Sequence, residues 1–294
     1  MNLIIRADDV GYTDVCNIGA FETMENGVVT SADVMLDCPG TEDALRRLKE
    51  LPWISVGWHT HFWGAPVLAS EKVPSLYDPD RKGFRKDIRT AQDVVYEEIL
   101  NECRAQLERC VRILGRAPDT GGPSDLDTPF GRALRQTEKE YGLKNNFMMR
   151  PALPGIPEEQ WDGEKAIPAP FSVFRDLETD SLTEIEKYNP IRFYLEDQMG
   201  MLTMDVPDTA TIIHAWHPGY LDYFVSCQGD YSPNARNFLR ARVIDVHALC
   251  SPEIHNWVRD HKIRLINVRD FLYGTNEYQN HLRSIGSDLY LAEM

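Results

Sequence analysis

Short apolar runs alternate with amphipathic segments along most of the chain. The first apolar run, 3–5, predicts a buried strand, and apolar residues at helical spacing over 17–26 predict a helix that ends at Gly27. The same patterns predict further strands at 28–36, 53–58, 144–148, 211–215 and 264–268, further helices at 41–51, 91–114, 130–141 and 234–249, a helix start at Ser251 and a short last helix through Phe271. Strands that alternate with helices build a parallel sheet with helical crossovers, so we expect an α/β fold.

Two local patterns add detail to this outline. Thr90 and Asp93 resemble a capping arrangement for the helix 91–114, and Cys103 and Cys110 on its predicted apolar face are expected to be buried. The stretch 60–89 is long and irregular. Inside a compact domain such a stretch is more often a functional loop than a simple connection. No linker or repeat interrupts the chain, so we expect one domain over 1–294.

Unusual polar residues gather where predicted strands end. Asp8 and Asp9 follow the first strand, His59 and His61 follow the third, and His214 and His217 end or follow a later one. Parallel α/β folds place their active sites at this end of the strands. We therefore expect these side chains to meet in one site.

Two adjacent carboxylates and two histidines suit a divalent metal ion such as Zn²⁺. Asp9 and His59 would be ligands, and Asp8, which points elsewhere, would be free to act as a base. The alternatives stay open at this point: Asp9 as a helix cap with Asp8 in solvent, and His59 and His61 packed against neighbouring tryptophans. His217, in turn, could simply be a turn residue before Pro218.

Aromatic residues flank these polar positions directly. Trp58, Trp63, Trp216 and Tyr220 are the candidates. Flat amphipathic rings beside a polar site suit the faces of sugars, so a small carbohydrate is the expected substrate.

Charge and cysteine content exclude several classes of partner. With 31 basic and 46 acidic residues the net charge is −15, which argues against nucleic acid and anionic membranes. No stretch approaches the ~18 apolar residues needed to span a bilayer. The six cysteines form no CxxC pair, so a reducing, cytoplasmic location is expected. Homo-oligomer formation is left open.

Four motifs resemble the YdjC/ChbG family of carbohydrate deacetylases. They are Ala7-Asp8-Asp9-Val10-Gly11, Asn17 with Asn26-Gly27-Val28-Val29-Thr30-Ser31, Gly57-Trp58-His59, and His214-Ala215-Trp216-His217-Pro218-Gly219-Tyr220. The resemblance implies a distorted TIM-like (β/α) barrel and a divalent metal, Zn or Mg, held by an Asp and two His.

One family motif is missing from this chain. The family follows its fourth strand with a His-rich segment that supplies a metal ligand, whereas residues 119–127 here contain no histidine. Asp125 or Asp127 could replace the ligand, His61 could supply it, or the site could be degraded; we favour Asp125, because hard divalent ions accept carboxylates. His61 is itself a departure, since the family has an apolar residue or Asn there.

The resulting hypothesis is metal-assisted removal of an N-acetyl group from an amino sugar or oligosaccharide. Asp8 would deprotonate the attacking water and His217 would protonate the leaving amine. Two other functions remain: a catalytically silent carbohydrate-binding relative, and a metal-dependent hydrolase or isomerase of a non-sugar substrate on the same barrel.

Overall fold

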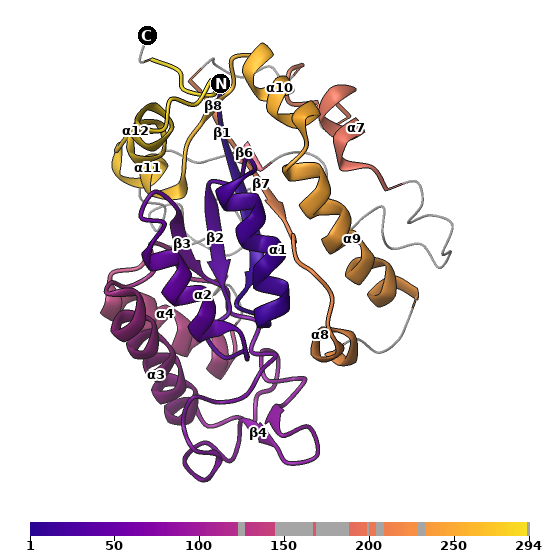
Figure 1. Ribbon diagram of the computed structural model, residues 1–294. Helices are drawn as coiled ribbons and strands as arrows, with labels where there is room; N and C mark the ends of the chain where they lie inside the picture. The colour runs from indigo at the N-terminus through magenta and orange to yellow at the C-terminus, as the bar shows by residue number, and fades with distance from the viewer. Residues whose placement is uncertain are drawn as a thin grey trace.

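A mostly parallel sheet forms the centre of the molecule (Figure 1). The computed structural model describes residues 1–122, 127–144, 167–168, 188–198, 200–203, 209–228 and 233–292. The strand order is β3 (Ser55–Trp58), β2 (Ser31–Val34), β1 (Asn2–Val10), β7 (Thr211–Trp216) and β6 (Ile167–Pro168), with β8 (Arg264–Leu265) paired to the start of β1. Single parallel bridges from Gly57 to Thr120 and from Thr120 to Lys144 continue the sheet beyond β3. The predicted α/β fold is confirmed, and this arrangement is consistent with a distorted TIM-like barrel.

Helices pack around this sheet. Their bounds are α1 (Asp14–Glu25), α2 (Thr41–Lys49), α3 (Tyr96–Leu114), α4 (Pro129–Tyr141), α7 (Pro190–Leu195), α8 (Tyr223–Gln228), α9 (Pro233–Leu249), α10 (Pro252–Asp260), α11 (Val268–Tyr273) and α12 (Glu277–Ser284). Figure 1 shows α1 and α2 against the β1–β3 part of the sheet and α9 beside α1. Cys103 and Cys110 are fully buried on α3, as predicted. Within the described ranges, no helix has the length and apolarity needed to cross a membrane.

Several predicted boundaries are wrong, with identifiable reasons. β1 runs on through Asp8 and Asp9, because those carboxylates have buried cationic partners and need not leave the sheet. α3 begins at Tyr96 after the cap residue Val95, because Arg85 binds Asp93 (3.1 Å) and draws it away from a helix cap at Thr90. β2 and β3 are shorter than predicted, and the stretch 60–89 contains a 3₁₀ turn (Ser70–Lys72) and a small hairpin of β4 (Tyr77–Asp78) and β5 (Gly83–Phe84). The predicted strand 144–148 lies outside the described residues beyond Lys144.

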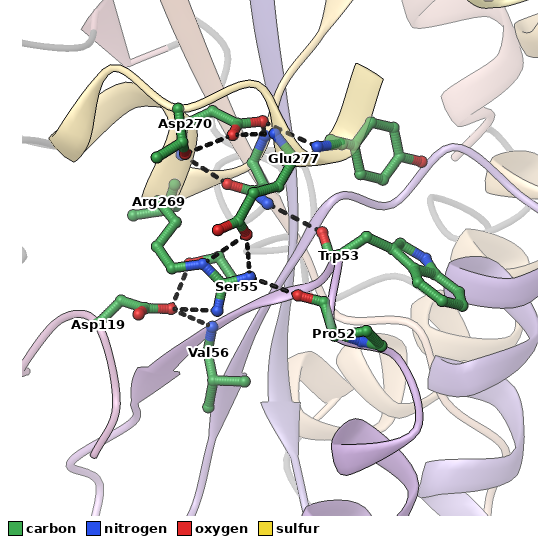
Figure 2. A network of polar contacts seen from close by, with 12 residues as sticks. Pro52, Trp53, Ser55, Val56, Asp119, Arg269, Asp270 and Glu277 are labelled. Carbon is green, nitrogen blue, oxygen red and sulfur yellow. Dashed lines mark hydrogen bonds and ion pairs between the residues drawn. The ribbon is translucent and has the colours of Figure 1, made fainter. Parts of the chain in front are cut away.

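A polar network ties the C-terminal segment to the beginning of β3 (Figure 2). Asp119 accepts hydrogen bonds from Ser55 Oγ (2.8 Å) and Val56 N (2.9 Å). Arg269 of α11 lies 3.9 Å from the same carboxylate, donates to Pro52 O (2.5 Å) and pairs with Glu277 of α12. This end of the sheet is therefore closed by α11 and α12. The opposite end, where β1, β3 and β7 finish, carries the predicted site.

Candidate active site

The end of β1 presents two carboxylates to different partners. Asp9 has a left-handed backbone (φ 59°), and the β1–β2 register shifts between Ala7 and Val10. Asp tolerates this conformation better than most residues, and such strain concentrates at functional sites. Arg6 Nε and Nη2 donate to Asp8 Oδ1 (2.5 Å) and Oδ2 (2.8 Å), whereas Asp9 lies against Arg242 and His59. The bulge thus gives adjacent carboxylates separate surroundings, as the sequence predicted.

Asp9, His59 and His61 form a cluster that could hold a metal ion. One ligand atom from each lies within 4.8 Å of the others. His59 Nε2 lies 3.0 Å from Asp9 Oδ1, and His61 Nε2 lies 3.7 Å from the same oxygen. Within the described part of the chain, neither Asp9 Oδ1 nor His59 Nε2 has a hydrogen-bond partner. Buried polar atoms without a hydrogen-bond partner are consistent with a cation bound between them. Two imidazoles and a carboxylate are a common set of zinc ligands.

His59 has the second partner that a metal-binding histidine usually has. Its Nδ1 lies 3.6 Å from Asp33 Oδ2, and Arg6 Nη1 lies 2.8 Å from the same oxygen. A carboxylate at the far nitrogen fixes the ring and its tautomer. Gly57, opposite Asp33 in the β2–β3 register, makes room for it, because a Cβ at Gly57 would lie 2.0 Å from Asp33 Oδ1.

The electrostatics also call for a positive charge between these carboxylates. Burial lowers the pKa of His59, but Asp33, Asp9 and Asp8 outweigh burial and raise the pKa to about 10. Burial likewise raises the pKa of Asp9, yet Arg242 and His59 hold that pKa well below its usual range. Asp9 is therefore ionised, and a cation beside it is favoured.

His61 is held mainly by its aromatic neighbour. Its ring stacks on Trp63 with centroids 4.0 Å apart, and Arg89 Nη1 lies 3.5 Å from its Nδ1. Phe62, which follows His61 in the chain, has a left-handed backbone (φ 59°) and packs against Phe84 and Phe130. Burial and nearby cations lower the pKa of His61 to about 3, so its ring is neutral, as a metal ligand must be, whereas His59, with its raised pKa, would release a proton when an ion binds.

His217 lies on the other side of Asp8. The side chain is buried, and its Nε2 is 3.9 Å from Asp8 Oδ2. Asp245 of α9 accepts a hydrogen bond from His217 N (3.2 Å) and another from Tyr188 OH (2.6 Å). Burial lowers the pKa of His217 to about 4, although Asp9 and Asp8 act to raise it. The expectation of an imidazole that titrates near neutral pH is therefore wrong: at pH 7 this ring is neutral.

The site adjoins a cavity of about 510 Å³. Trp63, the ring that stacks on His61, lines this cavity together with Phe224 and Asp37. The volume lies within the usual range for small-molecule pockets.

Comparison with known proteins identifies the family. The family model described as YdjC-like protein matches residues 2–260. The chain belongs to the YdjC-like family. It is 28% identical over 275 residues to a carbohydrate deacetylase of Brevibacillus brevis, covering 92% of this chain and 99% of that protein, and 26% identical over 274 residues to one of Clostridium beijerinckii, covering 92% and 100%.

A solved structure shares the fold. It belongs to a protein of Enterococcus faecalis V583 named for cellobiose-phosphate cleavage, with a TM-score of 0.61, 23% identity, and coverage of 90% of this chain and 97% of that one. The family model, which matches residues 2–260, confirms the resemblance inferred from the four motifs.

The structure does not bring the other described candidate residues of this YdjC-like protein into the metal cluster. Asp125 lies outside the described residues. Asp127 has a side chain that is 96% exposed and pairs with Arg132 at 3.4 Å, so it is not a ligand in this cluster. His214 is packed in the core against Tyr194 and Trp216 and does not join the cluster.

Two of the four predicted sugar-binding aromatics are core residues. Trp58 and Trp216 have no exposed surface, and their indole nitrogens donate to Gln106 Oε1 (3.2 Å) and Tyr194 OH (3.1 Å). Neither can offer a face to a sugar, which corrects the prediction. Trp63 (36% exposed) and Tyr220 (37% exposed) remain accessible.

Three charged residues of the site escaped the sequence analysis. Arg6 and Asp33 interrupt apolar strand patterns, and Arg242 occupies a position of α9 between Leu239 and Val246, in step with an apolar stripe. A charge where the periodicity calls for an apolar side chain was the available signal.

Proposed function

We propose that this protein is a metal-dependent carbohydrate deacetylase that hydrolyses the N-acetyl group of an amino sugar or a short oligosaccharide. Membership of the YdjC-like family and full-length similarity to proteins named carbohydrate deacetylase support the reaction. The observation that carries the proposal is the Asp9–His59–His61 cluster, with Asp9 buried and the two histidines partly buried, beside the base candidate Asp8. The three side chains present the donor set of a catalytic zinc site with room for further ligands.

His61 takes the place of the histidine that the family pattern supplies after its fourth strand. Its Nε2 faces Asp9 Oδ1, and burial keeps its ring neutral. Two imidazole ligands favour Zn²⁺ or a similar transition metal over Mg²⁺, which prefers oxygen. A bound divalent ion of this kind activates water and polarises a carbonyl group.

The chain's own residues supply proton transfer. Arg6 fixes both oxygens of Asp8, so this carboxylate keeps one orientation as it accepts a proton from water. Because His217 is neutral at pH 7, the proton it delivers to the leaving amine has to reach it during turnover, and Asp8 is the carboxylate that faces its Nε2. Trp63 would support the sugar ring from the wall of the adjoining cavity.

Product analysis tests the reaction class. We expect acetate from N-acetylglucosamine oligomers and none from N-acetylated amino acids at matched concentration. Acetate only from the amino acids would support the non-sugar hydrolase instead. Saccharide binding with neither acetate release nor stoichiometric metal by elemental analysis would support the catalytically silent alternative.

Location and assembly remain predictions. A cytoplasmic location rests on the reduced state expected of the cysteines, and Cys16, Cys38, Cys103, Cys110 and Cys250 are free thiols.

A further inference from the structure

Arg242 is a buried cation that reaches the metal cluster from α9. Its side chain is 1% exposed, and its Nη2 lies 2.5 Å from Asp9 Oδ2, also 1% exposed. Removing a guanidinium from water is strongly unfavourable unless a well-placed partner compensates. Asp9 is that partner, and the ring of Tyr12 lies 5.4 Å from the guanidinium carbon. Because burial of a guanidinium is unfavourable, we expect its contact with Asp9 to have a role at the proposed metal site.

Because of this contact, the two carboxylate oxygens of Asp9 have different partners. Oδ2 receives Arg242, whereas Oδ1 faces His59 Nε2 at 3.0 Å and His61 Nε2 at 3.7 Å and accepts no hydrogen bond within the described residues. A carboxylate can bind a metal through one oxygen or both. With Oδ2 held by the guanidinium, only Oδ1 is left for an ion between the histidines.

Backbone contacts fix α9 so that Arg242 reaches this position. Gly219 N donates to the carbonyl oxygen of Arg242 (3.3 Å), and Asp245, one turn further on, accepts from His217 N (3.2 Å). Gly219 in turn packs on α1, because a Cβ there would lie 2.3 Å from Cys16 Sγ. The segment after β7 is thus held between α1 and α9, and the distance from α9 to the end of β1 is set.

We propose that Arg242 is a positioning residue that restricts Asp9 to monodentate metal binding through Oδ1. One coordination position that a bidentate carboxylate would fill is then left for water and the acetyl oxygen of the substrate. This inference rests on the proposed metal site. It assigns a role in the site to a residue far away in the sequence, on a helix whose described side chains contribute no ligand to the cluster.

Cobalt substitution tests the proposal through a spectroscopic signature. Co²⁺ absorbs visible light strongly in four-coordinate sites and weakly at higher coordination numbers, so its absorption reports whether Asp9 adds a second oxygen. Affinity alone is a poorer readout, since loss of a nearby positive charge also favours cation binding. The variants are Arg242→Met and Arg242→Gln, which both remove the contact, and Arg242→Lys, which retains a charge and a donor. The polar Gln variant covers the case in which Met prevents folding.

We expect the Co²⁺ absorptivity of Arg242→Gln and Arg242→Met to fall at least about twofold, and kcat to fall by more than KM changes. Arg242→Lys should retain most of the wild-type spectrum. Arg240→Gln, at an exposed position of the same helix, is the matched control and should behave as wild type. A wild-type spectrum in folded Arg242→Gln would overturn the role of Arg242 and leave the metal site standing. Failure of the wild-type protein to bind Co²⁺ would instead refute the metal site itself, and this inference with it.

Discussion

Replacement of Asp245 by Asn should change how stability depends on pH. Asp245 is buried, accepts hydrogen bonds from Tyr188 OH and His217 N, and has Arg242 nearby on the same helix. Burial raises its pKa from 3.8 to about 7 despite these partners. The folded protein therefore holds a proton between these pH values that the unfolded chain has lost, and wild-type stability falls as pH rises towards 7.

The size of the effect follows from the two pKa values. With 3.8 unfolded and about 7 folded, the protonated carboxyl contributes about 3 kcal/mol at pH 5 and almost nothing at pH 8. Asn mimics the protonated acid, because its oxygen can accept from His217 N and its amide can donate to Tyr188. The free energy of unfolding of Asp245→Asn, relative to wild type, should therefore increase by about 3 kcal/mol between pH 5 and pH 8.

Urea unfolding followed by circular dichroism at several pH values measures this difference. Every other titrating group is shared by the two proteins, so the difference isolates Asp245. A difference between variant and wild type that stays constant from pH 5 to pH 8 would refute the reasoning, because it would mean that Asp245 is ionised throughout the range.

Three further predictions concern other parts of the structure. Asp33→Asn should weaken zinc binding about 10- to 100-fold, measured by competition with a chromophoric chelator, because His59 Nδ1 loses its carboxylate partner; unchanged affinity would contradict this. Trp63→Ala should raise KM about fivefold for an oligosaccharide, since stacking is worth ~1 kcal/mol, and should also lower kcat, because His61 loses the ring on which it stacks; an unchanged KM would place the sugar elsewhere. Arg269→Met should lower the free energy of unfolding by about 2 kcal/mol without changing kcat, as it breaks the network in Figure 2 far from the site; a large loss of kcat in the folded variant would contradict this.

The order of strands and helices follows from local patterns in the sequence. Hydrophobic periodicity and caps such as Ser251 and Gly115 depend on neighbours along the chain, and the helix that follows Ser251 and the end of α3 at Gly115 form where predicted. The start of α3 was missed because Asp93 pairs with Arg85, a contact that capping rules do not consider. Boundaries of this kind depend on side-chain pairing between segments.

The residues of the site also fall into those that local sequence patterns predict and those that depend on contacts between distant segments. Asp8, Asp9, His59 and His217 could be predicted because each stands at the end of a strand, where the fold itself brings them together. Trp58 and Trp216 stand beside them in the sequence but point into the core, since alternate residues of a strand face opposite ways. Arg242 could not be placed from the sequence, because its contact with Asp9 depends on how α9 packs against α1 and the end of β7.

Acetate release measured through a cycle of metal removal and return tests the central claim most directly. Purified protein would be assayed on N-acetylglucosamine oligomers as prepared, after exhaustive chelation, and after addition of one equivalent of Zn²⁺, with His59→Gln treated identically. The account predicts that wild-type activity is lost on chelation and restored by the single equivalent, while His59→Gln stays inactive throughout. Full wild-type activity after complete metal removal would contradict it.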